Sequence, residues 1–291
     1  MEQRFSQKAH RLCLWAGPAL FVLYIVGFVP MARLLPPPSP DWPAERLVHW
    51  LVGHQVGFQA GCVLMVMGGA LFGPWGAVPA IFTRKAEARF PVLYATQIIS
   101  LGCAVCLSVL VALFWAVASF RAGEISPEIT QALWDVGWFL FLFDAPPFLV
   151  WLAALALGIL WNPPEHQLYP RWIAYMTLGV LLEMTSAMAM VFFKFGPWTY
   201  TGLLAMWLTF SLFFGWLCVM TAFGFKAVAR QEALSRQEEA AAPGSYAARP
   251  DTASSDARAA ALPAPGSLGM PLAQPNGASL GGGPQEHTGS S

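Results

Sequence analysis

The sequence predicts an all-α fold: a polytopic membrane helix bundle of about six transmembrane helices with a disordered cytoplasmic C-terminal tail. Hydrophobic residues make up 56% of the 291 residues and charged residues only 11%, whereas a soluble domain carries about 25% charged residues. Six apolar stretches each reach the roughly 20 residues that a helix needs to cross a bilayer. The last part is rich in Ala, Pro, Gly and Ser, so it cannot bury a core.

The first two spans are expected at residues 12–33 and 51–82. The first follows a short basic segment and is longer than the apolar core of a signal peptide, which predicts an uncleaved helix. Repeated prolines in residues 36–43 exclude a helix there and favour an extended loop. In the second span, Gly73 and Pro74 predict a break or a kink.

The second span begins with small and polar residues. Gly53, Gly57 and Gly61 are four residues apart, so they lie on one helix face and allow another helix to approach closely. We therefore interpret them as a helix-packing face. His54, Gln55 and Gln59 need hydrogen-bond partners if they enter the bilayer, which makes them candidates for binding a ligand or a proton.

The remaining spans are expected at residues 91–120, 131–161, 172–193 and 199–228, so that residues 1–230 form the membrane domain and residues 231–291 the tail. The fourth span is longer than a crossing requires. It also contains Asp144 and the pair Pro146–Pro147. We therefore predict that this span is tilted, kinked or broken.

The distribution of Lys and Arg predicts the orientation, because cytoplasmic loops of membrane proteins carry an excess of both. This excess falls on the N-terminus, the loops near residues 84–89 and 171, and the segment after residue 226. Both termini are therefore expected in the cytoplasm, with the protein in the inner (plasma) membrane. Tryptophans near the predicted span ends are typical of an aromatic belt; they are Trp42, Trp50, Trp75, Trp134, Trp161, Trp172 and Trp198.

Two carboxyl groups lie near the centres of spans. Asp144 in the fourth span and Glu183 in the fifth reach similar depths when counted at about 1.5 Å per residue, and no Lys or Arg is central in any span. Charged groups at this depth usually face a cavity or a partner. The pair predicts either a ligand or proton site near the midplane or hydrogen-bonded packing between helices. Asp135 lies nearer the outer interface, where we expect an interfacial residue or one that pairs with a loop, with Arg46 and Arg121 as candidate partners.

Other function classes find little support. The formal net charge is zero, so nothing indicates a nucleic-acid partner. The chain has no nucleophile elbow, phosphate-binding glycine loop or zinc motif. The five cysteines lie in apolar runs, where a thiol behaves as a small hydrophobic group. We therefore expect no metal or cofactor and do not favour an enzyme.

Several motifs resemble those of a family of uncharacterised bacterial six-span membrane proteins. The motifs are Pro170-Arg171-Trp172, Gly196-Pro197-Trp198 and the stretch from Leu133 to Trp138. The resemblance covers most of residues 12–225. It implies the six-span topology and adds weight to Asp135, and it implies no established activity.

The sequence leaves three hypotheses about function. The first is binding or transport of a small apolar or amphipathic molecule, with the midplane carboxyl groups as polar anchors. The second is a non-catalytic membrane subunit that docks a partner helix, or a second copy, through its glycine face. The third, and the weakest, is an oxidoreductase subunit that binds haem or quinone through His54.

Overall fold

The computed structural model describes residues 2–87, 89–143, 145–163 and 167–241. Within these residues every regular element is helical. Six segments of this part of the chain are long and apolar enough to cross a membrane, the first being Lys8–Met31 and the last Leu203–Leu234. The predicted fold class is thus confirmed. The predicted tail lies outside the described residues from position 242 onwards.

The first half of the chain supplies three spans. The first consists of α1 (Glu2–Val26) and a π-helical segment, η1 (Gly27–Met31). A short helix, α2 (Ala44–Gly53), follows the proline-rich loop. The second and third spans are α3 (Gln55–Ala86) and α4 (Val92–Phe120).

The fourth span is broken near its middle. It consists of α5 (Pro127–Trp138), the π-helical η2 (Phe139–Phe143) and α6 (Pro146–Leu160). Proline suits the first turn of a helix, where its missing N–H group is not needed. Pro146 and Pro147 therefore begin a new helix, and the prediction of an interrupted fourth span is confirmed.

The last two spans each combine an α-helix with a helical turn of another type. The fifth is α7 (Arg171–Ala187), which a 3-10 turn, η4 (Met188–Phe192), extends. The sixth begins with the π-helical η5 (Leu203–Leu208) and continues as α8 (Thr209–Ala241).

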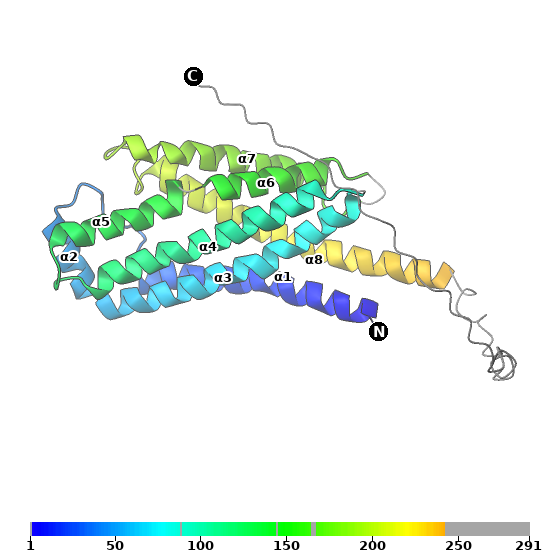
Figure 1. Cartoon of the computed structure of the whole chain (residues 1–291), viewed down its shortest axis with the longest axis horizontal. Coiled ribbons are helices and arrows are strands. Elements are labelled where there is room, and N and C mark those ends of the chain that lie inside the picture. Colours follow the sequence, from blue (N-terminus) through cyan, green and yellow to red (C-terminus); the bar gives the residue numbers. More distant parts are fainter. Residues whose placement is uncertain (1, 88, 144, 164–166, 242–291) are drawn as a thin grey trace, which may run out of the picture. The chain divides into compact units, whose positions relative to one another are not determined.

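The spans pack as a closed ring. Each contacts its neighbours in the sequence: α3 contacts α1 and α4, α4 contacts α6, α6 contacts α7, and α7 contacts α8. α8 also packs against α1, which closes the ring (Figure 1). We call the end where α1 begins and α8 ends the proximal end. The opposite end, which carries α2, is the distal end.

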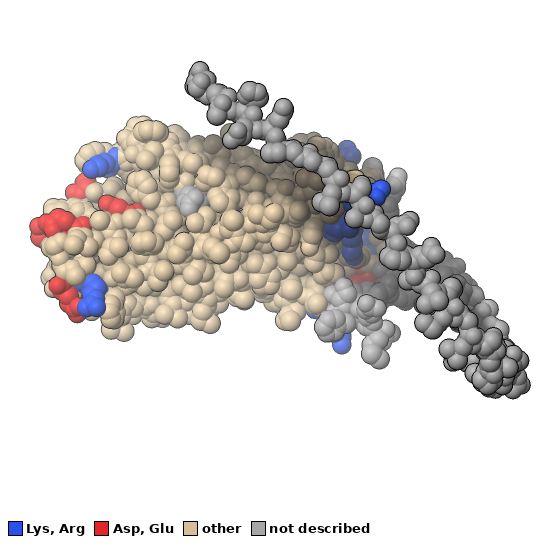
Figure 2. All heavy atoms as spheres, viewed as in Figure 1, with Lys and Arg blue, Asp and Glu red and all other residues tan. Residues whose placement is uncertain are grey.

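Charged side chains mark the two ends of this ring. On the face drawn in Figure 2, the described Lys, Arg, Asp and Glu side chains gather at the ends, and the band between them is uncharged. Such a band matches the hydrocarbon core of a bilayer, where an unpaired charge is costly. The apolar helices thus place the protein in a lipid bilayer.

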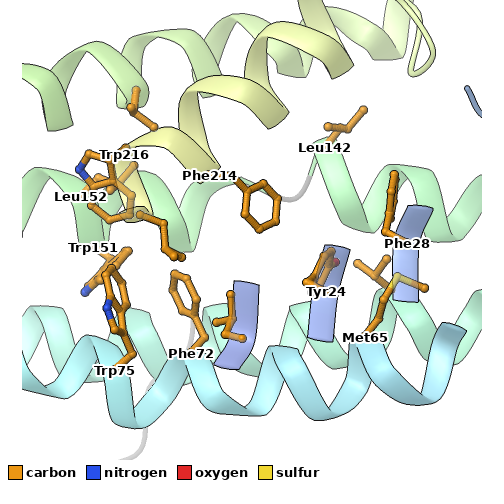
Figure 3. Packing of buried hydrophobic residues seen from close by; sticks show 14 of the residues in the cluster. Tyr24, Phe28, Met65, Phe72, Trp75, Leu142, Trp151, Leu152, Phe214 and Trp216 are labelled. Atoms are coloured by element: carbon orange, nitrogen blue, oxygen red, sulfur yellow. The ribbon is translucent and has the colours of Figure 1, made fainter. Parts of the chain in front are cut away.

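Two clusters of aromatic side chains fill the interior. The proximal cluster comprises Phe72, Trp75, Trp151 and Trp216, whose neighbouring ring centres are 5.3 to 6.1 Å apart. The distal cluster comprises Phe28, Trp115, Trp138 and Phe141, with neighbouring ring centres 5.0 to 6.5 Å apart. Figure 3 shows that Phe214 lies between the proximal cluster and Phe28 of the distal cluster.

Hydrogen bonds across the ring tie the proximal cluster together. The indole N–H of Trp75 donates to Thr221 Oγ1 at 2.8 Å, and that of Trp216 donates to Thr177 Oγ1 at 2.9 Å. Each bond joins two different spans. Because no water competes in the apolar interior, these threonines satisfy indole groups that burial would otherwise leave unpaired.

The structure corrects three details of the sequence prediction. The second span begins at Gln55 rather than residue 51, because the chain turns at His54 between α2 and α3. Pro74 and Pro79 lie inside α3 without ending it, as packed membrane helices allow. The last helix continues past residue 228 to Ala241, because Ala, Glu, Gln and Arg are strong helix formers.

Candidate functional site: a cavity between the aromatic clusters

A cavity of about 90 Å³ lies inside the ring, between the proximal and distal aromatic clusters. All six spans contribute to its wall. Seven of the sixteen described lining residues are aromatic; they are Tyr24, Phe72, Phe141, Phe148, Phe210, Phe213 and Phe214. The broken fourth span contributes both sides of its interruption, through Leu142 and Ala145. The interior therefore offers an apolar space at the depth where the fourth span changes from one helix to the next.

The size of this cavity limits what it can hold. An apolar cavity of about 150 Å³ is known to admit benzene, so 90 Å³ suits a small molecule or one end of an alkyl chain. Phe210, Phe213 and Phe214 lie on successive turns and adjoining faces of α8, with ring centres 4.5 Å apart for the first and last. Rotation of these rings is the simplest way for the space to adjust to a guest.

A buried carboxyl group lies against the wall. Thr209, which lines the cavity, donates a hydrogen bond of 2.7 Å to Oε1 of Glu183. Only 8% of Glu183 is exposed, and its Oε2 has no hydrogen-bond partner among the described residues. The neighbouring Met184 also lines the cavity. Glu183 is therefore a polar group held beside an apolar space with one acceptor oxygen left over.

The other predicted midplane carboxyl group, Asp144, lies outside the described residues. Its expected place at a depth similar to that of Glu183 stays a prediction. The hydroxyls next to Glu183 in the sequence do not bond its carboxyl group: that of Thr185 binds the Leu181 carbonyl, and that of Ser186 binds the backbone oxygen of Glu183.

Asp135 lies at the distal end and away from this cavity. Its Oδ1 accepts a hydrogen bond of 3.3 Å from the hydroxyl of Tyr200, whose ring stacks on Trp138 at 4.9 Å. Burial and, after it, the nearby carboxylate raise the pKa of Tyr200 above its ordinary value. Asp135 thus anchors the loop between the last two spans. Its expected pairing with an arginine is wrong within the described residues.

The two arginines in question have other partners. Arg46 stacks over the ring of Trp42 at 4.0 Å, and Arg121 pairs with Glu124 at 2.8 Å.

His54, Gln55 and Gln59 lie at the distal start of the second span, and none of them lines the central cavity. The ring of His54 binds the Trp50 carbonyl through Nδ1 at 2.9 Å. The amide of Gln55 donates to the Ser119 carbonyl at 2.9 Å. Gln59 is half-buried on the next turn. His54 and Gln55 thus have the hydrogen-bond partners that the sequence predicts they need, and in both cases the partner is a backbone carbonyl.

The glycine face of α3 packs inside the protein. A Cβ atom on Gly61 would lie 2.5 Å from the Gly27 carbonyl oxygen and 2.8 Å from the Ala32 nitrogen, and one on Gly57 would lie 3.2 Å from the Met31 oxygen. The predicted close approach is thus made with η1 of the same chain. Only Gly53 faces open space.

In the part of the chain that the structure describes, no group of three His, Cys, Asp or Glu side chains could hold a metal ion. Cys103 and Cys106 are exposed on the outer face of α4. In a bilayer this face meets lipid, so the two thiols contact acyl chains rather than water.

Sequence reasoning did not find Thr209 or the cavity itself. Thr209 is one of three hydroxyl residues, with Ser211 and Thr221, in the long apolar run from residue 203 to residue 225, and polar residues in such runs usually have a partner on another helix. A polar residue within an apolar run is therefore the signal that could have identified Thr209. The cavity depends on how side chains from six spans meet, which no local pattern records.

In comparisons with known proteins, no family model, no curated protein and no solved structure matches the chain. The resemblance to bacterial six-span proteins therefore stays an expectation from the sequence motifs.

Proposed function

We propose that this membrane protein binds a small apolar or amphipathic molecule in the central cavity and takes part in its transport. The observation that carries the proposal is the apolar cavity inside the ring, which is lined by Thr209, whose hydroxyl donates to the buried carboxyl group of Glu183. Small-molecule sites combine a mostly apolar lining with a few placed polar groups. The Thr209 oxygen gives its hydrogen to Glu183, so it can accept a hydrogen bond from a ligand head group such as a hydroxyl or an amine.

The ring architecture supports an internal site rather than a surface one. The cavity lies between two aromatic clusters that close it toward both ends of the bundle. A polar solute would gain little from such walls, whereas an alkyl chain or small ring buries apolar surface there at about 25 cal/mol per Å². This contrast favours an apolar body with at most one polar group.

We further propose that both termini face the cytoplasm and that the protein resides in the inner membrane. The proximal end carries Arg84, Lys85, Arg89, Arg171, Lys226 and Arg230. The distal end carries Arg33, Arg46, Arg121 and Lys194, so the excess lies on the proximal side. The positive-inside rule then assigns that side to the cytoplasm.

The alternative, docking of a partner helix through the glycine face, is less favoured. Gly57 and Gly61 are covered by η1 of the same chain, which leaves only Gly53 open. Association with a membrane partner or a second copy remains a prediction from the sequence, and it would need another face.

Photolabelling tests the ligand site. The probe is an octanol that carries a diazirine, applied to the purified protein in detergent with peptide mapping of the adduct. Val111 is 2% exposed and lines the cavity, so Val111→Phe fills the space. We expect this variant to reduce labelling of cavity residues by about tenfold, the equivalent of about 1.4 kcal/mol of binding.

The matched control changes the same residue type on the same helix. Val117 is 41% exposed on the outer face of α4, so Val117→Phe should label as the wild type does. Glu183→Gln should lower labelling by the alcohol but not by a diazirine alkane of the same length. Equal labelling of the Val111→Phe and Val117→Phe proteins, with both still eluting as folded monodisperse protein, would refute an internal site.

A further inference from the structure

A second hollow lies at the distal end, far from the central cavity. This groove has a volume of about 380 Å³ and runs between the end of the first span and the turn into the second. Its polar lining residues are Arg33, His54 and Gln55, and no acidic residue is among the described residues that line it. The groove therefore presents a positive charge and hydrogen-bonding groups with no anion of the protein to neutralise them.

Arg33 is the charged member of this groove. It forms no ion pair with any described residue. Its backbone φ angle is 52°, the only positive value among the described non-glycine residues. A left-handed backbone is unfavourable for a side chain such as arginine; it occurs in turns, and strained residues of this kind cluster at functional sites. The fold thus holds an exposed, unpaired guanidinium at this place despite a conformational cost.

The two polar neighbours are held in fixed orientations. Nδ1 of His54 must carry the hydrogen toward the Trp50 carbonyl, because a carbonyl only accepts. The Nε2 edge is then left to the groove. The amide nitrogen of Gln55 is engaged by the Ser119 carbonyl, so its oxygen remains as an acceptor. The groove therefore combines a cation with groups that suit the hydroxyls of a polar head group.

Apolar side chains flank these polar groups. Val56 is 81% exposed, Val52 48% and Met31 40%. Met31 ends the first membrane span and Gln55 begins the second, which places the groove at the level where lipid head groups meet acyl chains. A free phosphate ion would use the guanidinium alone, whereas a phospholipid would use both the cation and the exposed apolar side chains.

We propose that this groove binds an anionic phospholipid, with its phosphate on Arg33, its head-group hydroxyls toward Gln55 and His54, and its acyl chains along Val56 and Met31. Arginine matches phosphate in both charge and donor geometry. The proposal is independent of the ligand in the central cavity, because the two sites share no lining residue.

Native mass spectrometry of the full-length protein tests this site. The lipids are phosphatidylglycerol and phosphatidylcholine, each titrated into the detergent-solubilised protein, and inorganic phosphate is titrated separately. We expect wild-type protein to retain phosphatidylglycerol over phosphatidylcholine. Arg33→Gln should weaken the binding of the most tightly held phosphatidylglycerol molecule by about tenfold, since a hydrogen bond to a charged group contributes that much or more. Arg33→Lys should restore part of the loss.

Two further variants guard against indirect effects. Arg46→Gln removes a cation at the same end that stacks on Trp42 outside the groove, and it should bind phosphatidylglycerol as the wild type does. Gly53→Leu fills the groove without changing its charge, because a Cβ there meets nothing within 4 Å. This variant should weaken phosphatidylglycerol binding as Arg33→Gln does. Equal losses for Arg33→Gln and Arg46→Gln, or full competition by inorganic phosphate, would overturn the lipid assignment.

Discussion

Thr209 at the start of α8 donates a hydrogen bond of 2.7 Å to Glu183 on α7, and this bond joins the last two spans beside the central cavity. Thr209→Val keeps the shape of the side chain but removes the donor. We expect a loss of about 1 kcal/mol in the free energy of unfolding, the usual size of a hydrogen bond between membrane helices. Denaturant unfolding in detergent micelles measures it.

The control for this prediction is Thr185→Val on the same helix as Glu183. Thr185 is exposed and its hydroxyl binds only the carbonyl of Leu181 in its own helix. Its replacement should change the free energy of unfolding by less than about 0.5 kcal/mol. A similar loss in both variants would mean that the hydrogen bond between the spans contributes no more to the free energy of unfolding than a bond within one helix.

Gly61 permits the closest backbone approach between α3 and the first span. An alanine Cβ there would meet the backbone of Gly27 and Ala32, which cannot move aside as a side chain would. We expect Gly61→Ala to destabilise the protein by about 1 to 3 kcal/mol. Gly53→Ala, which meets nothing within 4 Å, should be neutral within about 0.5 kcal/mol. Equal stability of the two variants would contradict the close packing of η1.

Glu232 fastens the proximal ends of the first and last helices. Its Oε2 lies 2.7 Å from Arg11 and 3.8 Å from Arg236, and the side chain of Glu232 is only 8% exposed. Glu232→Gln should lower the free energy of unfolding by about 1 kcal/mol, near the upper end for a pair with one exposed partner. Glu124→Gln breaks a pair whose side chains are 55% and 62% exposed, and it should cost less. The reverse order would refute the role of Glu232 in closing the ring.

Tyr200 gives the protein a predictable response to high pH. Burial, together with the carboxylate of Asp135, raises its pKa in the folded state, whereas in the unfolded chain it is about 10. The folded state thus favours the neutral phenol. Its contribution to stability is fully present below pH about 10 and is lost as the pH rises toward the folded-state pKa.

Thermal unfolding between pH about 8 and about 11 measures this response. The wild-type midpoint should fall at the alkaline end. Tyr200→Phe should begin with a lower midpoint, because it lacks the bond to Asp135, and should fall less with pH. Tyr175→Phe, at a position that is 63% exposed, should follow the wild-type curve. A Tyr200→Phe curve parallel to the wild-type curve would show that another group titrates.

The spans were predictable because each depends on a local property, the length of an apolar run. The same holds for the break in the fourth span, where length and Pro146–Pro147 both indicate an interruption. The turn at His54 was not predicted, because the apolar run does not end at this turn. The predicted second span included Leu51 and Val52, which belong to the short helix α2. Hydropathy alone cannot separate two helices that follow one another directly.

The site was less predictable because it is built from contacts between distant residues. Trp75 and Trp134 lie near predicted span ends and were assigned to an interfacial belt, yet both are 1% exposed and belong to the core. Each is buried because its indole meets partners on other spans, as with Thr221 for Trp75. Glu183 was singled out correctly as a central carboxyl group, but its bond to Thr209 requires knowing that η5 and α8 begin beside it.

The closure of the ring between α1 and α8 also bears on biosynthesis. Leu20 and Tyr24 of the first span line the cavity together with Phe213 and Phe214 of the last, and the ring centres of Tyr24 and Phe214 are 5.8 Å apart, so a ribosome must deliver every span before that wall is complete. Until then α1 exposes to lipid or to an insertion chaperone the surface that α8 will later cover. The cavity is therefore completed only when the last span has been made, and a nascent chain released before residue 203 has no finished cavity.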